Sequence, residues 1–161
     1  MKTQWIVIIV LILVIALYLT RNKIKAAMTR AYINNNPGNI RPTNPPDNPW
    51  QGEVRPSTDK GFRQFKSMPL GYRAMFVNLK GYLALGLNTV EKIISSWAPS
   101  KDHNDTAAYI AAVAKKVGKK PTDIVLWSDT ATMRAIVKAI SEQESGIPAN
   151  MDDLDQGYKL L

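Results

Sequence analysis

The feature that most constrains this 161-residue chain is an uninterrupted apolar run near its N-terminus, from Trp5 to Leu19. A helix from Thr3 to Thr20, the uncharged limits of the run, would measure roughly 27 Å, slightly less than a bilayer core of about 30 Å. Aromatic residues lie near both ends, as is common at membrane interfaces. We therefore predict a transmembrane anchor over residues 1–20. A cleaved signal peptide is the alternative, but no small-residue cleavage site follows the run.

Basic residues are concentrated on the C-terminal side of this run. Lys2 stands alone before it, whereas four basic residues follow it: Arg21, Lys23, Lys25 and Arg30. The positive-inside rule predicts a single-pass topology with the C-terminal domain on the cytoplasmic side, after a basic juxtamembrane helix over residues 21–33. The formal net charge of +8 favours polyanionic partners such as acidic membrane lipids or an anionic cell wall. No nucleic-acid-binding motif accompanies the dispersed basic residues, so nucleic acid is not expected as a partner.

The remaining residues, 34–161, are expected to form one globular domain in two parts. Six of the ten prolines fall between Pro37 and Pro56, which argues against a long helix there and favours an irregular Pro/Asn-rich lobe with short strands near 51–55 and 61–65. Beyond the lobe, apolar residues recur at helical spacing in four segments that carry N-cap and stop signals, near 69–86, 89–98, 106–118 and 128–146. The sequence therefore predicts a mainly α fold class.

The composition narrows the chemistry that the chain can perform. It has no cysteine, and His103 is its single histidine. Thiol nucleophiles, disulfides and multi-histidine metal sites are therefore excluded, as is a Ser-His-Asp triad that does not use His103. We interpret His103, which lies in a polar loop, as a surface residue, and we expect no metal or cofactor. Catalysis would have to use carboxylates, tyrosines, amides or hydroxyls.

Glu144 is a carboxylate in an unusual position. It lies four residues after Ile140 and seven after Val137, on the apolar stripe of the last predicted helix, whereas Glu142 falls on the face toward water. Apolar neighbours remove water from the charged form and the terminal carbonyls of a helix repel it, so both effects favour the protonated carboxyl. General-acid cleavage of a glycosidic bond requires such a group. The alternative is that Glu144 bends into solvent or pairs with a lysine.

The residues around Glu144 resemble the catalytic segment of lysozyme-like glycosidases. "ESG" after an apolar helix, followed by "IPAN", is similar to the catalytic-glutamate segment of bacterial glucosaminidases and lytic transglycosylases. Other segments resemble glucosaminidase motifs in the same order, except that the glutamate segment comes last: "NNNPGNIR", "WQG", "STD", "FRQFKS" and "YIAAVAKKVG". The resemblance implies a circularly permuted, α+β lysozyme-like domain, peptidoglycan as substrate and Glu144 as general acid.

Residues 33–147 are also similar to a family of phage and prophage virion structural proteins with an NNPGNIR motif, which includes a membrane-associated member from tailless phages with an internal membrane. This resemblance implies a place in the virion internal membrane (the host inner membrane before assembly), with the domain facing the capsid and with other capsid or membrane proteins as partners. The expected function is a membrane-anchored virion enzyme that cleaves peptidoglycan during host entry. The alternative is a non-catalytic virion membrane protein that links the lipid vesicle to the capsid.

Several other side chains are candidates for the same site. A second carboxylate would lie about 5–9.5 Å from the first. Asp59 is the first choice, because the enzymes that the chain resembles carry their second acid in the corresponding segment, and Glu53 is the alternative; lytic transglycosylases need only one acid. Tyr109 is a candidate catalytic hydrogen-bonding group or a core tyrosine. The substrate-binding candidates are amides that could shape a sugar-binding floor or merely form a turn, and tryptophans that could stack on sugars or pack in the core: Asn36, Asn39, Trp50 and Trp97.

Overall fold

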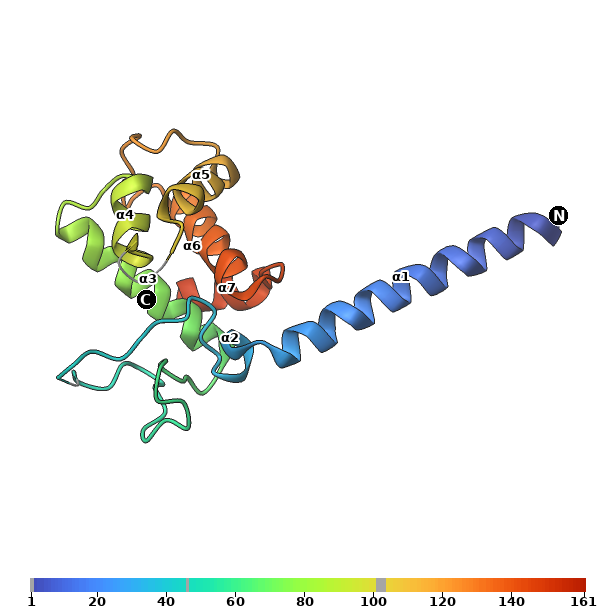
Figure 1. Cartoon of the computed structure of the whole chain (residues 1–161), viewed down its shortest axis with the longest axis horizontal. Coiled ribbons are helices and arrows are strands. Elements are labelled where there is room, and N and C mark those ends of the chain that lie inside the picture. The colour runs from blue at the N-terminus through green and yellow to red at the C-terminus, as the bar shows by residue number, and fades with distance from the viewer. Residues whose placement is uncertain (1, 46, 101–103) are drawn as a thin grey trace.

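The computed structural model describes residues 2–45, 47–100 and 104–161, and within the first helix the side chains of residues 7–21. His103 lies outside the described residues. The described chain is mainly helical, as expected, and its helices are α1 (Lys2–Met28), α2 (Arg30–Ile33), α3 (Met68–Ala84), α4 (Val90–Trp97), α5 (Thr106–Val117), α6 (Thr130–Ser145) and α7 (Met151–Lys159). Figure 1 shows α1 projecting away from a body that consists of the later helices and a loop-rich lobe.

The transmembrane anchor predicted over residues 1–20 is contradicted. Among the residues that the structure describes, no helix combines the length and the apolar character needed to cross a membrane. The apolar side chains described in α1 run from Val7 to Leu19. The fold class is therefore helical without the predicted N-terminal transmembrane helix, and the single-pass topology has no support. The segment 21–33 contains the end of α1 and the short helix α2.

The four helices expected after the lobe are present as α3, α4, α5 and α6, because their start and stop signals are local. Asp129 caps α6 by accepting a hydrogen bond from the backbone N–H of Thr132, and Gly146 ends α6 with a φ of 67° in the left-handed region. The apolar stripes of these helices pack into one core that contains Phe76, Ile93 and Ile136 as fully buried side chains. The last turn of α6 is thereby fixed against α5.

Helix α7 lies beyond the four helices that the sequence predicts. Asn150 is its N-cap and accepts hydrogen bonds from the backbone N–H groups of Asp152 and Asp153. Gly157, inside the helix, allows close packing on α3, because a Cβ there would lie 2.7 Å from the carbonyl oxygen of Pro69. Tertiary packing on α3 therefore outweighs the weak helical propensity of this segment.

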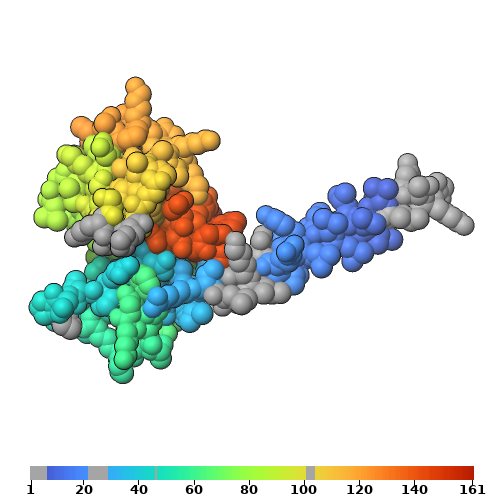
Figure 2. Space-filling model, in the orientation of Figure 1, coloured from blue at the N-terminus to red at the C-terminus, as the bar shows by residue number. Residues whose placement is uncertain are grey.

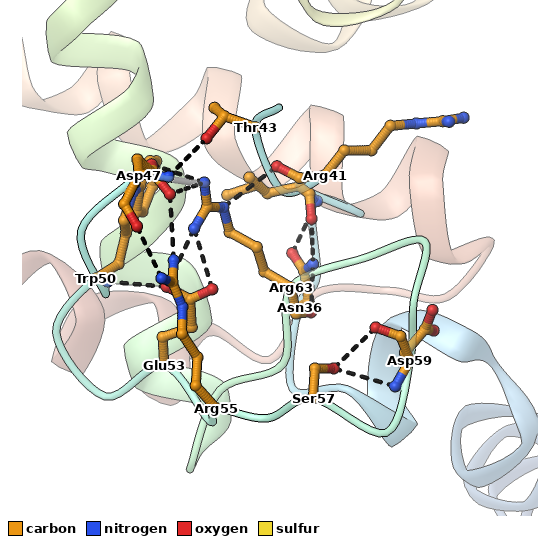
Figure 3. A network of polar contacts seen from close by, with 11 residues as sticks. Asn36, Arg41, Thr43, Asp47, Trp50, Glu53, Arg55, Ser57, Asp59 and Arg63 are labelled. Atoms are coloured by element: carbon orange, nitrogen blue, oxygen red, sulfur yellow. Dashed lines mark hydrogen bonds and ion pairs between the residues drawn. The ribbon is translucent and has the colours of Figure 1, made fainter. Parts of the chain in front are cut away.

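The proline-rich lobe, which we define as the described residues between 34 and 67, contains one isolated antiparallel bridge, Glu53 to Phe65, in place of the two short strands. A buried arginine organises the lobe. The Arg63 guanidinium lies 2.7 Å from Asp47 and 3.0 Å from Glu53, and it stacks on the Trp50 ring at 4.7 Å (Figure 3). Burial alone would raise the pKa of Asp47, but hydrogen bonds from Arg63 and Trp50 outweigh it and lower that pKa to about 2. Ion pairing thus partly replaces an apolar core in this lobe.

Candidate active site

A cleft of about 390 Å³ lies between the proline-rich lobe and helices α3, α4 and α6. Figure 2 shows the lobe, cyan to green, on one side of the body and the later helices on the other. The volume falls within the range of about 300–1,000 Å³ typical of ligand pockets. The cleft is lined by four aromatic side chains, namely Trp50, Phe62, Tyr82 and Trp97. Its polar lining includes Asn39, Arg41, Asn78, Ser96, Asn104 and Glu144. Among the described lining residues, Glu144 is the one carboxylate.

Both oxygens of the Glu144 carboxyl are held by neutral donors. The Tyr109 hydroxyl donates to Oε1 at 3.0 Å, and the Asn39 side-chain amide donates to Oε2 at 3.1 Å. Glu144 is half-buried at the last turn of α6, and within the described part of the chain it forms no ion pair with a lysine or arginine. The carboxyl is therefore fixed in orientation and open to the cleft.

Glu142, two residues earlier, is surrounded by positively charged side chains. Lys138 and Lys116 pair with it at 2.6 Å and 3.1 Å. Burial would raise its pKa, but hydrogen bonds from these two lysines outweigh burial and lower that pKa below its ordinary value. The pairing with lysine that was the alternative for Glu144 is thus made by Glu142, which stays charged.

Tyr109 lies on the first turns of α5 with its side chain almost fully buried. Burial, and then the neighbouring carboxyl of Glu144, raise the pKa of the Tyr109 hydroxyl well above its ordinary value. The hydroxyl therefore keeps its proton at any ordinary pH and acts as a hydrogen-bond donor to Glu144. Its ring is buried in the core, and its hydroxyl reaches the carboxyl of Glu144.

The two asparagines of the "NNNPGNIR" segment have different surroundings. Asn36 is fully buried, and its amide donates to the carbonyl of Arg63 at 2.8 Å and accepts from the backbone N–H of Ile40 at 2.9 Å. Its side chain closes the loop and does not line the cleft. Asn39 lines the cleft with a φ of 48°, and its Oδ1 has no hydrogen-bond partner among the described residues.

Gly71 fixes the position of this loop on α3. A Cβ at Gly71 would lie 2.0 Å from the carbonyl oxygen of Asn35 and 2.7 Å from the ring of Pro37. The loop backbone therefore rests directly on the helix, and that contact sets where Asn39 meets Glu144.

Both predicted tryptophans line the cleft. Trp97 is half-buried at the end of α4 and meets the Tyr82 ring edge-on at 6.4 Å. Trp50 lies across the cleft in the lobe, where its indole N–H donates to Asp47 at 2.9 Å. Each tryptophan is thus fixed by a neighbour while part of its surface stays open.

The two candidates for a second carboxylate are not brought to the cleft. Asp59 accepts hydrogen bonds from Arg30 at 2.6 Å and Asn34 at 2.7 Å, and these bonds hold its pKa well below its ordinary value. Glu53 is bound to Arg63 and Arg55 and is almost fully buried. Neither residue lines the cleft. Both are therefore structural anions of the lobe in this arrangement.

Sequence reasoning missed several lining residues. Asn78 and Tyr82 lie four residues apart on α3, so they share one face of the helix, and their polar groups interrupt the apolar pattern there. That interruption was an available signal. Arg41 ends the "NNNPGNIR" segment and was also not selected. Ser96 and Asn104 carry no sequence signal of this kind.

Comparison with known proteins places the chain among phage proteins. No family model matches it. It is 35% identical over 132 residues to Protein P5 of Pseudoalteromonas phage PM2, and the match covers 81% of this chain and 80% of that protein. The predicted kinship with phage proteins is confirmed. The chain therefore belongs to the family of Protein P5 of Pseudoalteromonas phage PM2.

Proposed function

We propose that the protein is a component of the phage virion and that its folded domain cleaves the glycan strands of peptidoglycan, with Glu144 as the general acid. One observation carries the catalytic part: the half-buried Glu144 carboxyl, held by Tyr109 and Asn39, is the one described acid of an aromatic-lined cleft. Kinship with a phage protein supports the virion part.

The lining suits an amino-sugar polymer. The open surfaces of Trp50 and Trp97 can stack on the apolar faces of sugar rings. Side-chain amides such as those of Asn78 and Asn104 can hydrogen-bond to hydroxyl and acetamido groups, because each amide both donates and accepts. A glycan strand lying between the lobe and α4 would then pass the carboxyl of Glu144.

In the proposed reaction, the Glu144 carboxyl donates its proton to the glycosidic oxygen as the bond from that oxygen to the anomeric carbon breaks. The donors from Tyr109 and Asn39 then stabilise the carboxylate that remains, since both hydrogen bonds strengthen as negative charge develops. We assign these two as positioning residues, because in the structure they contact Glu144.

Because Glu144 is the one carboxylate in the described lining, the positive charge that develops on the sugar has to be stabilised by another group. Asp59 and Glu53 pair with arginines and do not line the cleft. The partner in the displacement is then the substrate's own acetamido oxygen, which forms a bond to the anomeric carbon while the leaving oxygen takes the proton from Glu144. This scheme agrees with the resemblance to lytic transglycosylases.

The proposal is tested by clearing of a peptidoglycan suspension by the purified full chain. We expect Glu144→Gln to lower the clearing rate by about 10²–10⁴-fold, the usual contribution of a general acid. Glu142→Gln is the matched control, because it makes the same carboxyl-to-amide change two residues earlier, at a glutamate that is paired with lysines. Equal activity of Glu144→Gln and wild type would overturn the assignment.

A second candidate function is a non-catalytic structural protein of the virion. The observation that favours it is helix α1, whose apolar side chains from Val7 to Leu19 are 47–63% exposed and are suited to bind another virion component. Absence of clearing by the wild type at every pH tested, with the protein present in purified virions, would support this candidate.

A further inference from the structure

Arg41 is a positively charged residue of the cleft whose charge is not neutralised by any described carboxylate. Its side chain is exposed at the edge of the lobe and lines the cleft. Figure 3 shows it pointing away from the ion-pair network, and among the described residues its guanidinium has no carboxylate partner. Its contact is with the ring of Phe62, whose centroid lies 5.2 Å from Cζ.

The neighbouring arginines differ in this respect. Arg63, which also lines the cleft, is neutralised by Asp47 and Glu53. Arg30, whose guanidinium stacks on the same Phe62 ring at 4.4 Å, pairs with Asp59. Carboxylates of the lobe thus neutralise these two arginines. The guanidinium of Arg41 remains available to bind an anionic group of a ligand.

The backbone of Arg41 is nevertheless fixed. Its carbonyl accepts a hydrogen bond from Nε of the buried Arg63 at 3.2 Å, and the preceding residue, Ile40, is held by the Asn36 amide. A guanidinium on a fixed backbone beside an aromatic ring can bind a carboxylate through two parallel hydrogen bonds.

We infer that Arg41 is a specificity residue that binds a carboxylate of the substrate. This inference rests on the proposed function of the same cleft. The cleft would then favour glycan strands that carry acidic substituents over neutral polymers of N-acetylglucosamine. In peptidoglycan that carboxylate has two sources, the stem peptide or the lactyl group exposed when the peptide is removed.

These two sources are separated by calorimetric measurement of ligand binding. The protein is the full chain with Glu144→Gln, a substitution that prevents turnover. The probes are a neutral chitin oligosaccharide, a peptide-bearing peptidoglycan oligosaccharide and the same oligosaccharide after removal of its peptides. We expect Arg41→Gln in this background to weaken binding of an acidic probe by about tenfold, to leave the chitin oligosaccharide unchanged, and to remove most of the salt dependence. The acidic probe that loses affinity identifies the source of the carboxylate.

Lys60→Gln is the matched control, because it removes an exposed cation of the same lobe that does not line the cleft. Arg41→Lys should restore part of the affinity, since the charge returns without the planar pair of donors. Equal losses on acidic and neutral probes, or no loss on either acidic probe, would overturn the role of Arg41 while leaving the glycan-binding cleft intact. Failure of every glycan to bind the Glu144→Gln protein would overturn the proposed function itself.

Discussion

Replacing Gly71 by alanine tests the contact between helix α3 and the loop that places Asn39 beside Glu144. In ordinary helices a Gly→Ala change stabilises by about 1 kcal/mol, because alanine loses less backbone freedom on folding. At Gly71 the new Cβ would lie 2.0 Å from the backbone oxygen of Asn35, well inside the contact distance, so either the loop or α3 must move. Gly81 in the same helix is exposed and has nothing within 4 Å of a Cβ, which makes it a matched control.

The two substitutions should change the free energy of unfolding in opposite directions. Overpacking usually costs about 1–3 kcal/mol and occasionally more, and a clash with backbone belongs to the upper end. Gly71→Ala should therefore lower the free energy of unfolding by about 2 kcal/mol after the helix gain is included, whereas Gly81→Ala should raise it by about 0.5–1 kcal/mol. Urea unfolding followed by circular dichroism measures both. A Gly71→Ala protein as stable as Gly81→Ala would show that the loop does not rest on α3 as described.

The remaining predictions concern the lobe and the cleft. Arg63→Met should destabilise the fold by about 3–5 kcal/mol in urea unfolding, because it removes the buried guanidinium that pairs with both Glu53 and Asp47, whereas Arg55→Met, which breaks more exposed ion pairs, should cost much less. Since the pKa of Asp47 is lowered from 3.8 to about 2, its ionised form stabilises the fold above the unfolded pKa, and this contribution is lost as the pH falls through the folded value. Asp47→Asn should accordingly be less stable than wild type at neutral pH and should lose less stability on acidification from about pH 4 to about pH 2; parallel acid profiles would contradict this. Trp97→Ala should weaken glycan binding by about 1–3 kcal/mol in calorimetry, and unchanged affinity would remove it from the sugar-binding surface.

The helices were predictable because their signals are local. Apolar spacing, the Asp129 cap and the Gly146 stop lie within a few residues of the elements that they define. The same spacing placed Glu144 on an inward face, and the structure has it half-buried in a cleft. Helix α7 escaped prediction because its stability depends on packing of Gly157 against α3, a contact between distant parts of the sequence.

The lobe was less predictable because ion pairs determine its structure. Nothing in the local sequence indicates that Arg63 is buried or that it takes Asp47 and Glu53 as partners. Asp59 was selected by resemblance, but its contacts with Arg30 and Asn34 hold it outside the cleft. Long-range pairing of charges therefore decides which carboxylates remain free for chemistry. The N-terminal apolar run led to a wrong prediction, because its length and the aromatic residues at its ends indicate a membrane span that no described helix provides.

The most direct test of the central claim is mass spectrometry of the products released from purified peptidoglycan by wild type and by Glu144→Gln, with equal folding of the two proteins checked by their thermal unfolding. If Glu144 is the general acid in a cleft with one carboxylate, the wild type releases fragments cut at glycosidic bonds and the variant releases almost none. Fragments cut only in the stem peptides, or the same glycan fragments from both proteins, would contradict the account.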